Sequence, residues 1–478
     1  MNTLLQALKN ETTTENGAIT HLTSNKNCVD FFFKVGALRQ AEKSIQIAAF
    51  EKAMKEDSIL AMKILFYGRD VRGGQGERDI FKNCIQWLAF HSPSLLPMDL
   101  IRKIPFYGRW KDLLFLMDTP LEDKALTAIQ EGLVAGDPLC AKWCPREKSS
   151  LKDVAKKIRK KIGLSSKEYR QLLSECSNTV ETQMCSGDWV NINYSHVPSQ
   201  CFIKNKNAFQ KNDSERYTSF IEDVLEGKKE IKATTLFPHQ IAKRILEEES
   251  DEDTTLVALW ENLPNYLKGS KSNILPMIDV SGSMFGQPLA VATSLGMYLA
   301  ERTKGEFRDM FLTFSENPEL VRLQGDSVAE RLRNISQADW GMNTDFTKAF
   351  EHILRVAKKH NVLPDSMPTM LLVLSDMQFD ESQGRTDTHF SWMEEEFEKA
   401  GYKLPKIVFW NLDAHFGTPA KCSDDSVAMV SGFSPSIMKA VLNAEEFNPI
   451  SVMMEALKDI KPDCSNLPSE FEYEREVI

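Results

Sequence analysis

The sequence lacks the features that would place it in a membrane or on a secretory route. No apolar run reaches the roughly 18 residues needed to cross a bilayer, and the longest, such as Met370–Leu374, have the length of a β-strand. The N-terminal residues show no basic stretch followed by a long apolar core, so we expect no secretory signal. Nine cysteines are scattered without a regular framework, which favours a reducing, cytoplasmic compartment.

Motifs of common enzymes are missing as well. The sequence contains no HExxH, no GxSxG and no GxxxxGK[ST]. Cys140 and Cys144 form a single C-x₃-C spacing without a second pair, which argues against zinc. A hydrolase that uses a metal-bound water would also need a general base, for which the sequence offers no candidate. We therefore expect a binding protein and not an enzyme.

Charge is distributed unevenly along the chain. The formal net charge is −10, yet residues 1–245 hold 37 Lys and Arg against 29 Asp and Glu, and the remainder holds 21 against 39. A basic first half could face nucleic acid while the acidic second half meets a different partner. The alternative is that both halves simply expose solvated charges.

The first half has helical periodicity. Apolar residues recur every three to four positions in residues 39–65 and 77–90. The sequence Phe66–Arg69 recurs as Phe106–Arg109, 40 residues later, which is the period of HEAT-type helical pairs. We predict a flexible tail over 1–27, a helical repeat domain over 28–245 and an acidic linker over 246–269, which begins with the run LEEESDED.

The second half, residues 270–478, alternates strands and helices. Strands are predicted at 274–280, 309–315, 369–377, 406–413 and 427–433, and helices at 288–303, 346–360, 391–401, 436–443 and 451–460. This alternation predicts a mostly parallel, doubly wound α/β sheet with helices on both faces. The expected fold class is thus helical repeats followed by an α/β domain, whose ligand would sit at the carboxyl ends of the strands.

Oxygen-bearing side chains gather at those strand ends. The first strand runs into Asp279-Val-Ser281-Gly-Ser283, Thr344 precedes a helix, and Asp376 ends a later strand. In order, spacing and context these residues resemble the metal site of von Willebrand factor A-type (vWA) domains. The resemblance implies that Ser281, Ser283 and Thr344 bind one divalent cation directly, and Asp279 and Asp376 directly or through water. The alternative is an empty turn in which the two serines cap helices.

The ligand types indicate which ion such a site would hold. All five side chains offer hard oxygens, so Mg²⁺ is preferred, with Mn²⁺ or Ca²⁺ as substitutes. Two carboxylates leave the ion coordinatively unsaturated. An open position would then accept a water or a carboxylate from a protein partner.

Arginine and lysine mark a second candidate site in the basic half. Three glycines and three arginines stand in Arg69–Asp79 between two predicted helices, where guanidinium groups beside a flexible backbone suit phosphate. The alternative is that these arginines pair with Asp70, Glu77 and Asp79. The candidate RNA-binding residues are Arg69, Arg72, Arg78, Arg109, Arg146, Lys148, Lys156, Lys157, Arg159, Lys160 and Lys161.

Together with the helical periodicity and the vWA-type motifs, the Arg69–Asp79 segment resembles the TROVE module of the Ro ribonucleoprotein autoantigen family. A closer resemblance is to TROVE-like plus vWA proteins that carry a domain of unknown function. It covers residues 28–460 and rests on Ala141–Lys148, Trp189–Ser199, Phe237-Pro238-His239, Phe409-Trp410-Asn411 and Ser431-Gly432-Phe433.

Two functions follow from these observations and resemblances. The leading one is a non-enzymatic, RNA-associated protein whose basic helices contact phosphates and whose vWA-type half binds a protein through Mg²⁺. The other is a protein-interaction scaffold, without RNA, that uses the metal to capture an acidic side chain.

Overall fold

The computed structural model describes residues 10–14, 19–247, 253–314, 318–337, 346–378, 389–413, 417–422 and 424–462. The chain forms two compact units. The sheet unit comprises Met1–Ala41 and Leu236–Asp459, and the helical unit comprises Glu42–Thr235 and Ile460–Ile478. These boundaries differ from the predicted domains, 28–245 and 270–478. Both ends of the predicted repeat domain, residues 28–41 and 236–245, pack with the sheet.

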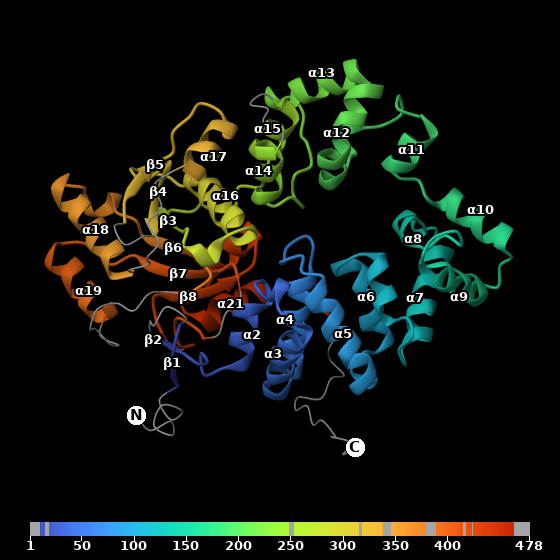
Figure 1. The fold of residues 1–478 in the computed structure, drawn as a ribbon, viewed down its shortest axis with the longest axis horizontal. Helices are drawn as coiled ribbons and strands as arrows, with labels where there is room; N and C mark the ends of the chain where they lie inside the picture. Colours follow the sequence, from blue (N-terminus) through green and yellow to red (C-terminus); the bar gives the residue numbers. More distant parts are fainter. Residues whose placement is uncertain are drawn as a thin grey trace. The chain divides into compact units, whose positions relative to one another are not determined.

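The sheet unit contains a six-stranded sheet in the order β5-β4-β3-β6-β7-β8 (Figure 1). All neighbours pair in parallel except β4 and β5, which are antiparallel. The strands are β3 Ile274–Asp279, β4 Met310–Phe314, β5 Leu320–Arg322, β6 Met370–Ser375, β7 Lys406–Asn411 and β8 Val427–Ser431. Every residue of β3, β6 and β8 is buried, as the continuous apolar runs of a covered parallel sheet require.

Helices connect these strands and cover them. They are α16 Gln287–Arg302, α17 Val328–Gln337, α18 Phe346–Lys359, α19 His389–Lys399, α20 Met438–Asn443 and α21 Pro449–Leu457. Helix α16 packs against β3, β4 and β6, and α21 packs against β8. The alternation of strands and helices predicted for the second half is confirmed, and the edge strand β5 and helix α17 are additions to it.

The N-terminal segment also belongs to the sheet unit. In place of the predicted flexible tail, β1 Glu11–Thr13 and β2 Ile19–His21 pair as an antiparallel hairpin. Helix α2 Asn27–Val35 buries three consecutive phenylalanines and packs against β8 and α21. At its end a Cβ on Gly36 would lie 2.6 Å from Cα of Gly432, so only glycine permits this close backbone contact.

The predicted acidic linker is likewise part of the packed unit. Helices α14 Pro238–Glu247 and α15 Thr254–Glu261 contact each other, and α14 packs on α16 and α17. Trp260 is buried and its indole nitrogen donates to Glu301 Oε2 at 2.9 Å. The apolar residues after the acidic run therefore fold onto the sheet unit instead of forming a spacer.

The helical unit consists of short helices joined by tight loops, and the predicted N-terminal helical region is confirmed. Its α-helices are α3 Lys43–Glu56, α4 Ser58–Arg69, α5 Asp79–His91, α6 Met98–Tyr107, α7 Glu122–Val134, α8 Pro138–Trp143, α9 Lys152–Ile162, α10 Ser166–Cys176, α11 Val180–Ser186, α12 Ser199–Asn212 and α13 Ser214–Leu225. A 3₁₀ segment, η3 Trp110–Leu116, packs against α5, α6, α7 and α8. No helix in the described ranges is both long and apolar enough to cross a membrane.

Candidate functional site

The turn after β3 brings together three of the predicted metal ligands. Asp279 is the last residue of β3 and is fully buried. Its Oδ1 accepts a hydrogen bond from the Ser281 amide at 2.9 Å, which holds the turn closed. The hydroxyls of Ser281 and Ser283 lie 3.0 Å apart. One carboxylate and two hydroxyls thus converge at the carboxyl end of the strand.

The neighbouring strand β6 contributes the second carboxylate. Ser375, its last residue, donates from its hydroxyl to Oδ2 of Asp279, and Asp376 follows immediately, fully buried. Oδ1 of Asp376 accepts from the Gln378 amide at 3.0 Å. Burial, and then the charge of Asp376, raises the pKa of Asp279 to about 7. The two acids are therefore close enough to repel each other in a desolvated place.

These residues fit a divalent cation. A dication would neutralise the two buried carboxylates, and the hydroxyls would add neutral oxygen ligands. Among the described residues no group of three or more His, Cys, Asp or Glu side chains could hold a metal ion, so a cation at this turn would need the serine hydroxyls as ligands besides the two carboxylates. Ser281 and its neighbour Ser283 make no capping bond to the helical turn Gly282–Met284 or to α16, which speaks against the helix-cap alternative. The predicted ligand Thr344 lies outside the described residues.

The predicted arginines do gather, but around a buried acid. Arg69, the last residue of α4, is 2% exposed and donates to Asp112 Oδ2 from Nε at 2.8 Å and from Nη2 at 2.5 Å. The Arg109 amide donates to the same oxygen at 3.0 Å, and Arg78 Nε lies 3.6 Å from Oδ1. Arg69 is thus used inside the unit, and its burial does not fit the predicted contact with RNA.

Two lysines of the basic helix α9 pair with acids of a neighbouring segment that the local sequence does not reveal. Lys157 pairs with Asp118 and Glu122 at 2.7 Å each, and Lys161 pairs with Asp123 at 2.5 Å. The acids precede or begin α7, which packs against α9. These acids lie more than 30 positions away in the sequence, so the residues next to the basic cluster do not reveal them.

The other predicted cations divide into paired and exposed groups. Arg159 pairs with Glu147 at 3.0 Å and Lys156 with Asp153 at 3.1 Å. Arg72 is exposed and donates to the Phe106 carbonyl, with its guanidinium 5.5 Å from the Phe106 ring. Arg146, Lys148 and Lys160 are exposed, and no ion pair is found for them in the described part of the chain.

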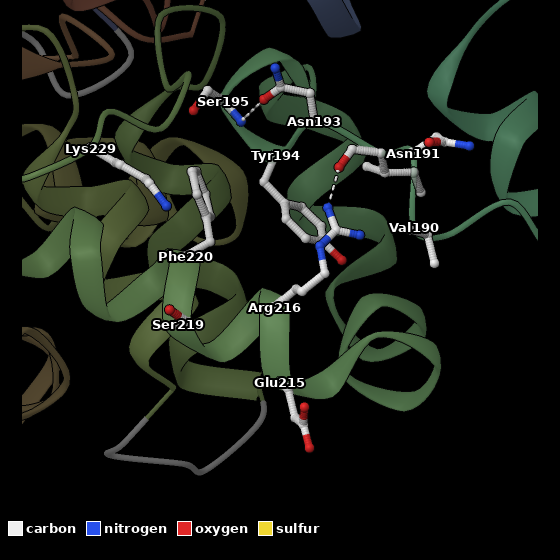
Figure 2. A pocket seen from close by; sticks show the side chains of 11 residues that line it. Val190, Asn191, Asn193, Tyr194, Ser195, Glu215, Arg216, Ser219, Phe220 and Lys229 are labelled. Atoms are coloured by element: carbon white, nitrogen blue, oxygen red, sulfur yellow. Dashed lines mark hydrogen bonds between the residues drawn. The ribbon is translucent and has the colours of Figure 1, made fainter.

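A cavity of about 640 Å³ opens over the segment that follows α11 (Figure 2). The rings of Tyr194 and Phe220 line it, with Arg216 beside the first ring and Lys229 beside the second. Arg216 already donates to the Trp189 and Ile192 carbonyls and pairs with Asp213, and Lys229 pairs with Asp223. The cations at this cavity therefore stabilise its own walls.

The fold and the strand-end cluster define a two-unit protein with a candidate oxygen-ligand site on a mostly parallel sheet. Residues 14–138 and 126–268 match the model "Domain of unknown function (DUF2828)", and residues 273–467 match "Domain of unknown function (DUF7788)". The chain belongs to the DUF2828 family, whose model matches more than half of it. Neither description names a vWA or a TROVE domain.

Proteins similar to this chain include one viral relative and one solved bacterial structure. An uncharacterized protein of Acanthamoeba polyphaga mimivirus is 31% identical over 499 residues, which cover 93% of this chain and 87% of that protein. The crystal structure of the Ro (RSR) protein of Deinococcus radiodurans has 11% identity and a TM-score of 0.40, over 91% of this chain and all of that one.

Proposed function

We propose that the protein binds a divalent cation, Mg²⁺ by preference, at Asp279, Ser281, Ser283 and Asp376, and that the bound ion captures a carboxylate of a protein partner. The observation that carries this proposal is the convergence of two buried carboxylates and two hydroxyls at the ends of adjacent parallel strands. Thr344, on the vWA resemblance, would supply a third hydroxyl.

Charge explains why the site would hold an ion. Two carboxylates buried side by side are unfavourable, and a cation between them would remove both the repulsion and the desolvation cost. The ion would keep one side open to solvent, because Ser283 is exposed whereas Asp279 and Asp376 are buried. Phe285, 87% exposed, stands next to this open side and offers an apolar contact to the same partner.

RNA association through the helical unit, the other predicted activity, has less support. Arg69, Lys157 and Lys161 are committed to acids of the same unit. The ion pairs favour a protein-binding scaffold over an RNA-binding surface built from the whole predicted set. Nucleic acid that copurifies with the intact protein and is lost on replacing Arg146 and Lys148 would reverse this preference.

Metal binding is tested first. The full chain, stripped of metal, is titrated with Mn²⁺ in a calorimeter and by electron paramagnetic resonance. Asp279→Asn keeps the shape of the side chain and removes its charge, and Asp365→Ala removes an exposed carboxylate elsewhere in the sheet unit. We expect saturable binding in wild type and Asp365→Ala, and its loss in Asp279→Asn and Asp376→Asn. Unchanged Mn²⁺ affinity in a folded Asp279→Asn protein would end the proposal.

Capture of a carboxylate is tested on the loaded protein. Water-proton relaxation reports the water on bound Mn²⁺, and a carboxylate that replaces this water lowers the enhancement. Poly-glutamate should lower it, and poly-lysine should not. If both polymers leave the relaxation unchanged while Mn²⁺ is bound, the ion is structural and the capture role is wrong.

A further inference from the structure

The two Phe-Tyr-Gly-Arg copies meet in the helical unit. Phe66 and Tyr107 pack edge to face at 5.3 Å, and the Val71 amide donates to the Tyr107 carbonyl at 3.0 Å. This contact brings Arg69 of the first copy and Arg109 of the second to the same acid, Asp112. A Cβ on Gly108 would lie 2.2 Å from Asp112 Oδ2, so the glycine of the second copy makes room for the carboxylate.

Asp112 does not satisfy the arginines that surround it. Its Oδ2 accepts two hydrogen bonds from the Arg69 guanidinium and one from the Arg109 amide. The Arg109 guanidinium itself donates no hydrogen bond to this oxygen. Arg78 Nε stands 3.6 Å from Oδ1, too far for a hydrogen bond. The buried Nε atoms of Arg78 and Arg109 make no hydrogen bond among the described residues, and neither does Oδ1 of Asp112, to which Arg78 makes only the longer ion pair.

Positive charge is in excess at this point. The charged groups that act on Arg109 are one acid, Asp112, and two cations, Arg69 and Arg78. Burial first, and then the two neighbouring arginines, lower the pKa of Arg109 against the opposing effect of Asp112. Among the groups that act on Arg109, its own guanidinium included, three guanidinium groups face one carboxylate. Partly buried cations without matching anions are unfavourable.

Aromatic rings hold the two under-satisfied arginines in place. The guanidinium carbon of Arg78 lies 5.0 Å from the centre of the Phe115 ring, and that of Arg109 lies 5.3 Å from the Trp143 ring. Such stacking orients a guanidinium plane while leaving its edge, which carries the hydrogen-bond donors, available. Arg78 keeps 39% of its side chain exposed, so a ligand can reach it from solvent.

We propose that Arg78 and Arg109 form a binding site for a phosphate group, with Asp112 and Arg69 as its buried base. Guanidinium forks suit both carboxylates and phosphates. Phosphate is favoured here because a phosphomonoester carries close to two negative charges at neutral pH and so matches the local excess, whereas a carboxylate carries one. The site is independent of the metal cluster and of the cavity over Tyr194.

The phosphate could be a free ion, the end of a nucleotide or part of an RNA backbone, and one set of titrations separates these sources. The full chain is titrated by calorimetry with inorganic phosphate, with adenosine 5′-monophosphate and with a short oligouridylate that carries only phosphodiesters. Ionic strength is held constant with chloride. The variants are Arg78→Gln and Arg109→Gln, and the control is Arg102→Gln, which removes an exposed arginine of α6 paired with Asp99 and Glu131.

We expect saturable binding of at least one probe. Each of the two site variants should weaken its affinity about tenfold or more, because charge-assisted hydrogen bonds are lost. The affinity should be unchanged in Arg102→Gln. Binding of the two monoester-type probes without the oligouridylate identifies a free or terminal phosphate, and binding of all three identifies a backbone phosphate. Absence of saturable binding for every probe, or weakening by only one site variant, overturns the shared site.

A measurement on the wild-type protein covers the case in which a variant does not fold. Hydrogen exchange is followed by mass spectrometry with the tightest probe and without it. Protection should concentrate in residues 69–78 and 107–112, which carry the arginines. Uniform or absent protection in these segments at saturating probe would refute the location.

Discussion

Replacing Asp112 by alanine should destabilise the helical unit more than any surface substitution in it. Asp112 is fully buried and is the acceptor for Arg69, which is itself 2% exposed. Alanine leaves the Arg69 guanidinium as a buried cation without its partner. Breaking a buried ion pair in this way typically costs about 3–5 kcal/mol. For a unit of roughly 150–250 residues that corresponds to a fall in Tm of about 6–20 °C.

The structure also predicts how the loss can be recovered. The double substitution Arg69→Met with Asp112→Leu removes both charges and refills the space with apolar side chains. It should be more stable than Asp112→Ala alone, because the unpaired charge and not the lost volume dominates the cost. Asp99→Ala, which breaks an exposed pair with Arg102, serves as the control and should shift the Tm little.

The assay is thermal and urea unfolding by circular dichroism, with hydrogen exchange of α4 and η3 to assign the transition to the helical unit. A loss below about 1 kcal/mol for Asp112→Ala, the range of an exposed pair, would mean that Arg69 finds another acceptor. It would also remove the buried base on which the proposed phosphate site is built.

Three further predictions concern other parts of the chain. Burial lowers the pKa of His239 to about 3. The stability that the neutral imidazole contributes is therefore present above the unfolded pKa of 6.5 and is lost as the pH falls from 6.5 towards 3. In urea unfolding, wild type should lose up to about 5 kcal/mol more than His239→Gln between pH 7 and pH 3. Gly36→Ala should destabilise the sheet unit by about 1–3 kcal/mol or more through a backbone clash. Gly282→Ala, with no atom within 4 Å of the added carbon, should not destabilise it. Equal Tm values for the two variants would contradict the close contact at Gly36. Lys157→Gln with Lys161→Gln should lower the Tm at low salt and have a smaller effect at high salt, because the ion pairs that join α9 to α7 are screened.

Much of the sheet unit could be predicted from the sequence because buried parallel strands are continuous apolar runs. The predicted strands at 274–280 and 369–377 correspond to β3 and β6 within two residues at each end. The antiparallel edge strand Leu320–Arg322 was not predicted, since two half-buried residues and one exposed residue carry no periodic apolar pattern. The helical periodicity over 39–65 covers two helices, because the Asp57 side chain caps a new helix at Ser58 by accepting from the Leu60 amide.

The candidate sites differ in how far local sequence could predict them. The D-x-S-x-S turn is local, and strand order then brings Asp376 beside Asp279, so this cluster could be anticipated. Ser375 was not singled out, although its position at a strand end beside Asp376 was a usable signal. Asp112, which binds Arg69 from 43 residues away, and the acids facing α9 could not be found without knowing which helices are neighbours.

The contact between Gly36 and Gly432 has a consequence for the order in which the protein can be completed during synthesis. Helix α2 is made among the first 40 residues, yet its buried face is covered by β8 and α21, which emerge about 400 residues later. Most of the helical unit, Glu42–Thr235, is translated in between, as an insertion within the sheet unit. The three phenylalanines of α2 must therefore stay shielded by transient contacts or a chaperone until the last strand leaves the ribosome. A shortened chain that ends before β8 would expose them permanently, which makes truncated products targets for aggregation and degradation.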